Sequence, residues 1–224
     1  MPIKHWPIDH RPREKLIKNG AGTLSNEELL AICLRFGIKG KSAIDLAHEL
    51  ILHFGSIRAL CHASYESVSH IKGIGMAKFT QFQAILELAL RVLEEDLKDN
   101  ICLNSTQTVQ KYLQLLIGDK PHESFTLLFL DVKNRLLQAE ELFRGSLTHA
   151  SVYPREIIKR ALHYNAAAVI LAHNHPSGVP DPSKADLTLT HELIHTLKLV
   201  DVKVLDHIVV TGNKAYSFAE HGLI

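Results

Sequence analysis

The chain has 224 residues, of which 46% are hydrophobic and 22% charged, a balance typical of a globular protein with one large or two small domains. Its formal net charge of +1 excludes a globally basic nucleic-acid-binding protein, so any basic surface must be local. Three cysteines without a CxxC pair argue against a disulfide framework, and no signal-peptide core or membrane-length apolar run is found, so we expect a cytoplasmic protein without a membrane partner.

Helical patterns dominate the first hundred residues. Ser25 and Glu28 have the spacing of a capping box, in which each side chain satisfies a backbone amide of a first helical turn. The glycines of Gly73-Ile-Gly75 interrupt the pattern before a long helix. The expected helices cover residues 12–19, the stretch from Ser25 through 34, Ser42 to about 54, 65–71 and 76–97.

Beyond residue 101 apolar strands alternate with helices, which predicts an α/β layered domain. Turns at 133–135 and 212–213 link two strand pairs as hairpins, so the sheet should be partly antiparallel. A polar stretch places the domain boundary near 97–103, between an all-helical domain (1–100) and an α/β domain (102–224). The expected strands are 124–131, 136–144, 167–173, 203–211 and 215–218, and the expected helices 106–117, 154–165 and 183–199.

The segment 171–186 carries the strongest functional signal. His173 and His175 lie two residues apart at the end of an expected strand, where alternate side chains point the same way, and Asp186 follows in the first turn of a helix. Two imidazoles and one carboxylate would leave a fourth tetrahedral position for water, as in catalytic zinc sites. The alternatives are an ordinary surface pair of histidines and, for Ser183 and Asp186, a simple capping box.

Metal-assisted hydrolysis also needs a group that takes and returns a proton. Spacing leaves four candidates, with only a modest lead for Glu123, which opens an expected buried strand: Glu123, Glu140, Glu141 and Glu156. Ser183 or Ser177 could donate a hydrogen bond to an oxyanion, although both also suit caps and loops.

The segment 173–186 resembles the JAMM motif of JAB1/MPN-type metalloproteases, in which His173-x-His175 is followed after ten residues by Asp186, with Ser183 inside that interval. The segment Glu123-Ser-Phe125 resembles the one that carries that family's glutamate. The whole chain from about residue 9 resembles the bacterial RadC family. The matching pieces are 11–15, 24–30, 73–75, 144–146, 154–156 and 173–178.

The resemblance implies an MPN/JAB-type α/β (α+β) fold with a cytidine-deaminase-like layered mixed sheet, preceded by a small helix-hairpin-helix-like domain. It also implies zinc bound by His173, His175 and Asp186, with Glu123 as acid/base catalyst. Asn174 departs from the serine or threonine usual between the histidines of eukaryotic relatives, which bears on the substrate more than on the metal, since its side chain should face away from the ion.

The segment 71–78 resembles the hairpin of helix-hairpin-helix modules, in which glycines let backbone amides reach a DNA phosphate. Lys72, Gly73, Gly75 and Lys78 would then contact DNA. An interhelical turn whose glycines supply positive φ explains the same residues equally well.

Two functions are therefore expected from the sequence. The first is a zinc-dependent hydrolase of JAMM type that cleaves a peptide or isopeptide bond of a protein substrate, with Glu123 moving the proton and Ser183 assisting. The alternative is a DNA-binding accessory protein of repair or recombination with a structural or vestigial metal domain. A zinc nucleobase deaminase is disfavoured because the chain lacks a PCxxC ligand pair.

Overall fold

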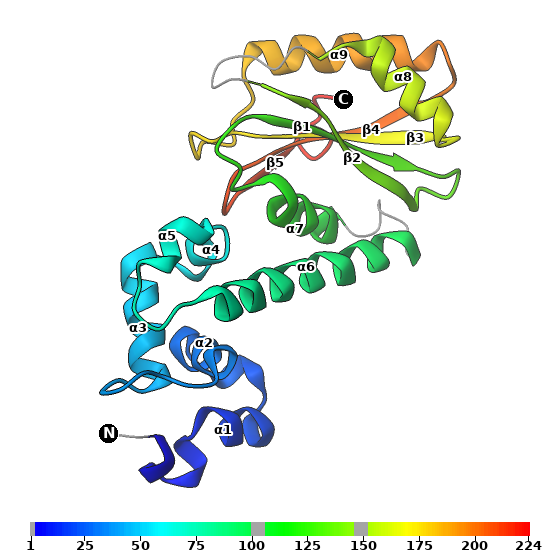
Figure 1. Ribbon diagram of the computed structural model, residues 1–224. Coiled ribbons are helices and arrows are strands. Elements are labelled where there is room, and N and C mark those ends of the chain that lie inside the picture. Colours follow the sequence, from blue (N-terminus) through cyan, green and yellow to red (C-terminus); the bar gives the residue numbers. More distant parts are fainter. Residues whose placement is uncertain (1–2, 100–105, 146–151) are drawn as a thin grey trace. The chain divides into compact units, whose positions relative to one another are not determined.

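The computed structural model describes residues 3–99, 106–145 and 152–224, and Figure 1 traces their helices and strands along the chain. The chain divides into two compact units, Met1–Leu88 and Ala89–Ile224. Cys102, Ser146 and part of the expected boundary at 97–103 lie outside the described residues, and that boundary stays a prediction. Within the described ranges, none of the helices is both long and apolar enough to cross a bilayer.

The first unit is helical, as expected. Capping boxes open two of its helices, with Ser25 and Glu28 in one and Ser42 and Asp45 in the other. Its core gathers around fully buried Leu46 and Leu50. Its elements are the 3-10 turns Ile3–His5, Ile8–His10 and Ala21–Thr23 and the helices α1 (Pro12–Asn19), α2 (Asn26–Leu34), α3 (Ala43–Phe54), α4 (Ile57–Cys61), α5 (Tyr65–Ser69) and the first part of α6 (Met76–Asp99).

Helix α4 is absent from the sequence-based expectation. Its five residues are too few to show an apolar period, although Ser56 caps it by accepting a hydrogen bond from the amide of Ala59. The last turns of α6 belong to the second unit, and Leu97 is buried in its core.

The second unit contains a five-stranded mixed sheet of order β2-β1-β3-β4-β5. The pairs β1–β2, β1–β3 and β4–β5 are antiparallel, whereas β3 and β4 run parallel and are joined through α9. This confirms the expected partly antiparallel α/β arrangement. The elements are α7 (Thr106–Ile117), β1 (Ser124–Leu130), β2 (Leu136–Arg144), α8 (Pro154–His163), β3 (Ala168–Asn174), α9 (Lys184–Lys198), β4 (Lys203–Val210) and β5 (Ala215–Ser217).

Helices cover both faces of the sheet, with α7 on one side and α8 and α9 on the other (Figure 1). Alternate residues of β3 therefore enter different cores: Ile170 and Ala172 pack with α7, whereas Val169 and Leu171 pack with α8 and α9. By the same alternation, His173 belongs to the face covered by α9, and Asn174 to the opposite face.

Candidate metal centre

Three side chains converge where β3 ends and α9 begins. Nε2 of His173 lies 3.0 Å from Nε2 of His175 and 3.3 Å from Oδ1 of Asp186, and Nε2 of His175 lies 3.7 Å from Oδ2 of Asp186. The side chains are buried or half-buried. The structure thus brings together the three residues that the sequence nominates as metal ligands.

Hydrogen bonds fix which nitrogen of His175 carries a proton. Its Nδ1 lies 2.8 Å from the carbonyl oxygen of Val179. Because a carbonyl can only accept, Nδ1–H must donate, and the neutral ring then presents the lone pair of Nε2 to the site.

A longer chain of hydrogen bonds fixes the tautomer of His173. The hydroxyl of Thr190 donates to the carbonyl oxygen of Asp186 at 2.6 Å and accordingly accepts from Nδ1–H of His207, also at 2.6 Å. Nε2 of His207 is then an acceptor for Nδ1–H of His173 at 2.8 Å. His173, like His175, therefore directs the lone pair of its Nε2 into the site.

Burial enforces the neutral state of His207. The ring is fully buried, and the loss of hydration on charging lowers the pKa of His207 well below its ordinary value. His207 and Thr190 are absent from the sequence-based expectation. The only signal for His207 was a histidine inside an apolar strand, and its meaning depends on the pairing of β3 with β4.

The three inward-facing donors fit a zinc ion. Zinc bonds of about 2.0–2.1 Å in a tetrahedron put neighbouring ligand atoms about 3.3 Å apart. The observed separations of 3.0 Å between the two Nε2 atoms and 3.3 Å between Nε2 of His173 and Oδ1 of Asp186 lie close to that value. Two imidazole lone pairs facing each other beside a carboxylate repel one another unless a cation lies between them, so the arrangement suits a bound metal.

The close approach of these side chains shifts the pKa values of Asp186 and His175. Burial alone would favour the protonated acid, but in the metal-free site the adjacent imidazoles of His173 and His175 stabilise the carboxylate and hold the pKa of Asp186 well below its usual range. In return, the hydrogen bond with Asp186 raises the pKa of His175, against the opposing effect of burial, and the charge of Glu123 raises it a little further. The carboxylate is therefore ionised near neutral pH and available as a ligand.

Ser183 holds Asp186 in place. Its amide and its hydroxyl both donate to Oδ2 of Asp186 at 2.7 Å, and the amide of Asp186 donates back to the hydroxyl oxygen at 3.2 Å. The pair is thus a capping box of α9 that leaves Oδ1 directed at His173. Capping and ligation are compatible. A role for Ser183 at an oxyanion stays a prediction, since its hydroxyl proton is directed at Asp186 here.

Glu123 lies in the same cavity as the ligands. This cavity, of about 440 Å³, is lined by Glu123, His173, His175, Ser183 and Asp186. The antiparallel register pairs Phe125 with His173, and Glu123 lies just before β1 at this edge of the sheet, where it lines the cavity together with His175. The backbone oxygen of Glu123 also accepts from the amide of Gly145 at 2.9 Å, which ties this residue to the end of β2.

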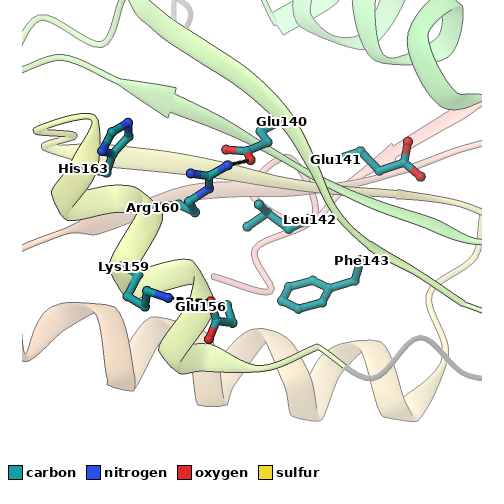
Figure 2. Close-up of a pocket in the computed structure, with 8 residues that line it drawn as sticks. All are labelled: Glu140, Glu141, Leu142, Phe143, Glu156, Lys159, Arg160 and His163. Carbon is teal, nitrogen blue, oxygen red and sulfur yellow. Dashed lines mark hydrogen bonds and ion pairs between the residues drawn. The ribbon is translucent and has the colours of Figure 1, made fainter.

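The other three candidate carboxylates line a different cavity, between β2 and α8 (Figure 2). Glu140 is turned toward Arg160 and also accepts from the hydroxyl of Tyr164 at 3.0 Å. Glu156 pairs with Lys159 in its own helix. Glu141 points away from these pairs and contacts Lys120. Of the four residues that spacing left open, the geometry favours Glu123.

The segment 71–78 is placed by packing against the loop after α2. Gly73 has φ +95°, and a Cβ there would lie 2.4 Å from Cγ2 of Ile38. Nζ of Lys78 donates to the carbonyl oxygen of Phe36 at 3.0 Å, and burial lowers the pKa of Lys78. The interhelical-turn interpretation accounts for these contacts, while DNA binding through Lys72, Gly73, Gly75 and Lys78 stays a prediction.

Comparison with known proteins agrees with this fold. The family model described as "RadC-like JAB domain" matches residues 103–223, and the one described as "UPF0758 N-terminal" matches residues 3–80. The UPF0758 protein of Janthinobacterium sp. (strain Marseille) is 61% identical over 222 residues, which is 99% of either chain. Those of Herminiimonas arsenicoxydans and Nitrosomonas eutropha are 58% and 57% identical over 99% and 100% of either chain.

The second unit is a RadC-like JAB domain. Its five-stranded mixed sheet lies between helices, and His173, His175 and Asp186 meet at the edge of that sheet, in agreement with the matching family model. An all-helical UPF0758 N-terminal segment precedes it. The chain belongs to the RadC family of UPF0758 proteins.

Proposed function

We propose that this protein is a zinc-dependent hydrolase of JAMM type that cleaves an amide bond, as a metallopeptidase or isopeptidase. The observation that carries the proposal is the convergence of two imidazole lone pairs and one carboxylate in a cavity that also contains Glu123. Bound zinc would polarise a carbonyl and activate water for its hydrolysis. His173, His175 and Asp186 would hold it.

Glu123 is the residue assigned to proton transfer. It is half-buried, it lines the ligand cavity, and its charge contributes to the raised pKa of His175. A carboxylate that lines the same cavity as the candidate ligands can take a proton from water and return it to the leaving amine. The hydrogen bond from the amide of Gly145 anchors the backbone of Glu123 beside the end of β2.

The metal assignment is tested by elemental analysis of the purified full chain. Wild type should contain about one zinc ion per chain, and His173→Ala and Asp186→Ala should contain almost none, since two remaining ligands bind zinc weakly. His191→Ala, which alters an exposed histidine on α9, is the matched control and should retain zinc. Stoichiometric zinc in both ligand variants would contradict the assignment.

Hydrolysis is tested with a degenerate library of peptides and lysine-branched isopeptides, read by mass spectrometry. Glu123→Gln should keep zinc and lose about two to four orders of magnitude in rate, the usual contribution of a general acid/base. Glu156→Gln makes the same change outside the cavity and should cleave like wild type. Cleavage that survives Glu123→Gln at the wild-type rate, or zinc-loaded protein that cleaves no member of the library, would exclude the proposal.

A further inference from the structure

A strained turn follows α2 in the helical unit. Arg35 has φ 64° and ψ −48°, and the amide of Phe36 donates to the carbonyl oxygen of Leu34 at 2.7 Å, which closes a three-residue turn around Arg35. A non-glycine residue persists in such a conformation only where its surroundings hold it. The turn sends Arg35 and Phe36 outward, and 69% of the Phe36 surface is exposed.

The segment 71–78 provides that support. Lys78 holds the carbonyl oxygen of Phe36, and the bare face of Gly73 lets Ile38 pack closely against it. Two backbone hydrogen bonds of 3.0 Å between Ile38 and Lys41 close the far side of the loop. Two of the residues that suggested a DNA-binding hairpin therefore position a different element, the loop that carries Arg35 and Phe36.

This loop borders a cavity of about 460 Å³ at the start of α1. Three arginines, Arg11, Arg13 and Arg35, line it together with one carboxylate, Glu14, and apolar side chains of α2 contribute to its wall. Nε of Arg11 donates to the carbonyl oxygen of Trp6 at 3.1 Å, and Nη1 lies 4.0 Å from Glu14. Within the described part of the chain, no carboxylate pairs with Arg13 or Arg35, so the cavity has excess positive charge.

The aromatic ring completes the arrangement. The guanidinium carbon of Arg35 lies 5.8 Å from the centre of the Phe36 ring, which places a cation beside an exposed aromatic side chain. Guanidinium groups recognise phosphate through paired hydrogen bonds, and exposed aromatic rings bind the flat faces of bases. An acidic peptide would use the arginines but would leave the ring without a partner.

We propose that the cavity formed by Arg11, Arg13, Arg35 and Phe36 binds an unpaired nucleotide of a nucleic-acid strand. The arginines contact its phosphate and the Phe36 ring stacks on its base. The nucleotide must be unpaired because a continuous duplex hides the faces of its bases. This site lies in the helical unit, so the inference goes beyond the hydrolase proposal and does not depend on it.

The electrostatic part is tested by fluorescence anisotropy of the full chain with a labelled oligothymidine at several salt concentrations. Arg13→Ala and Arg35→Ala should each weaken binding and lower the slope of log K against log salt by about 0.7, the value for one lost contact to single-stranded phosphate. Arg155→Ala removes another exposed arginine, from the second unit, and should change neither quantity. Arg13 lies outside the strained turn, so its variant separates lost charge from a rearranged loop.

The stacking part is tested at Phe36. Phe36→Leu keeps an apolar side chain but removes the ring, and should weaken binding about five- to a hundredfold, whereas Phe36→Tyr should restore it. A blunt duplex of equal length should bind less tightly than the single strand. The proposal is overturned if wild type does not bind, if the arginine and Phe36 variants bind like wild type, if polyglutamate competes as well as the oligonucleotide, or if Lys72→Ala alone abolishes binding.

Discussion

The side-chain oxygen of Asn174 accepts a hydrogen bond from the backbone amide of Ser124 at 2.8 Å. Its amide nitrogen donates to the carbonyl oxygens of Lys120 and His122 at 3.2 and 3.1 Å. Asn174 is fully buried and points away from the candidate metal centre, as the alternation along β3 predicts. The residue between the two histidines therefore fastens the chain segment that leads to Glu123.

Replacing Asn174 by alanine should destabilise the second unit while leaving the metal ligands in place. The substitution leaves one backbone amide and two carbonyls without their partner, which should lower the free energy of unfolding by about 2–4 kcal/mol. Urea unfolding measures this loss, and elemental analysis should still find zinc. Asn213→Ala, in an exposed turn, should change the stability by less than about 0.5 kcal/mol. Equal stability of the two variants would contradict the assigned role.

His207 should control zinc affinity without touching the metal. In His207→Leu, Nδ1–H of His173 has no acceptor, so the ring is free to rotate and to change tautomer, and zinc affinity should fall about 10- to 100-fold. His207→Gln supplies an acceptor and should recover part of the loss. Competition with a fluorescent zinc chelator measures these affinities. His191→Leu is the matched exposed control, and unaltered zinc binding by His207→Leu would refute the role.

Much of this architecture could be predicted because its signals are local. The capping boxes at Ser25 and Ser183 fix where α2 and α9 begin, and the apolar run from Ser124 identifies a strand buried on both faces. The three candidate metal ligands could be grouped for the same reason, since His173 and His175 lie at the end of one strand and Asp186 in the first turn of the next helix.

The supporting residues could not be predicted because they meet only through tertiary packing. His207 reaches His173 only because β4 lies parallel to β3, and Thr190 reaches His207 only because α9 crosses that face. The choice among four carboxylates likewise required the folded structure, which places Glu123 in one cavity with His173 and His175. The spacing of these residues along the sequence does not predict these contacts.

Zinc should stabilise the protein more strongly as the pH rises. In the metal-free protein the hydrogen bond with Asp186 raises the pKa of His175 above its ordinary 6.5, although burial opposes the shift. The pairing of protonated His175 with Asp186 therefore stabilises the metal-free protein fully below about pH 6.5, and this stabilisation is lost as the pH rises through the folded-state pKa of His175. Zinc requires a neutral imidazole, so it competes with this proton.

The increase in Tm on adding zinc to metal-free protein should therefore grow between about pH 6 and about pH 8. Calorimetry with chelator and with zinc, across buffers of constant ionic strength, measures this difference. Asp186→Asn removes both a ligand and the partner that raises the pKa of His175, so its Tm should respond little to zinc at any of these pH values. A zinc-dependent gain that stays constant with pH would disprove the coupling.

Two glycines two residues apart, Gly73 and Gly75, should differ in how much stability the protein loses when each is replaced by alanine. Gly73 has φ +95°, and a Cβ would lie 2.4 Å from Ile38, so Gly73→Ala should cost about 1–3 kcal/mol in the free energy of unfolding of the helical unit. Gly75 has no positive φ and no atom within 4 Å of an added Cβ, so Gly75→Ala should be nearly neutral. In an Ile38→Ala background the clash disappears and only the backbone penalty of about 1 kcal/mol remains. Chemical unfolding of the single and double variants measures these differences, and equal costs at the two glycines would show that Ile38 does not pack against Gly73 as described.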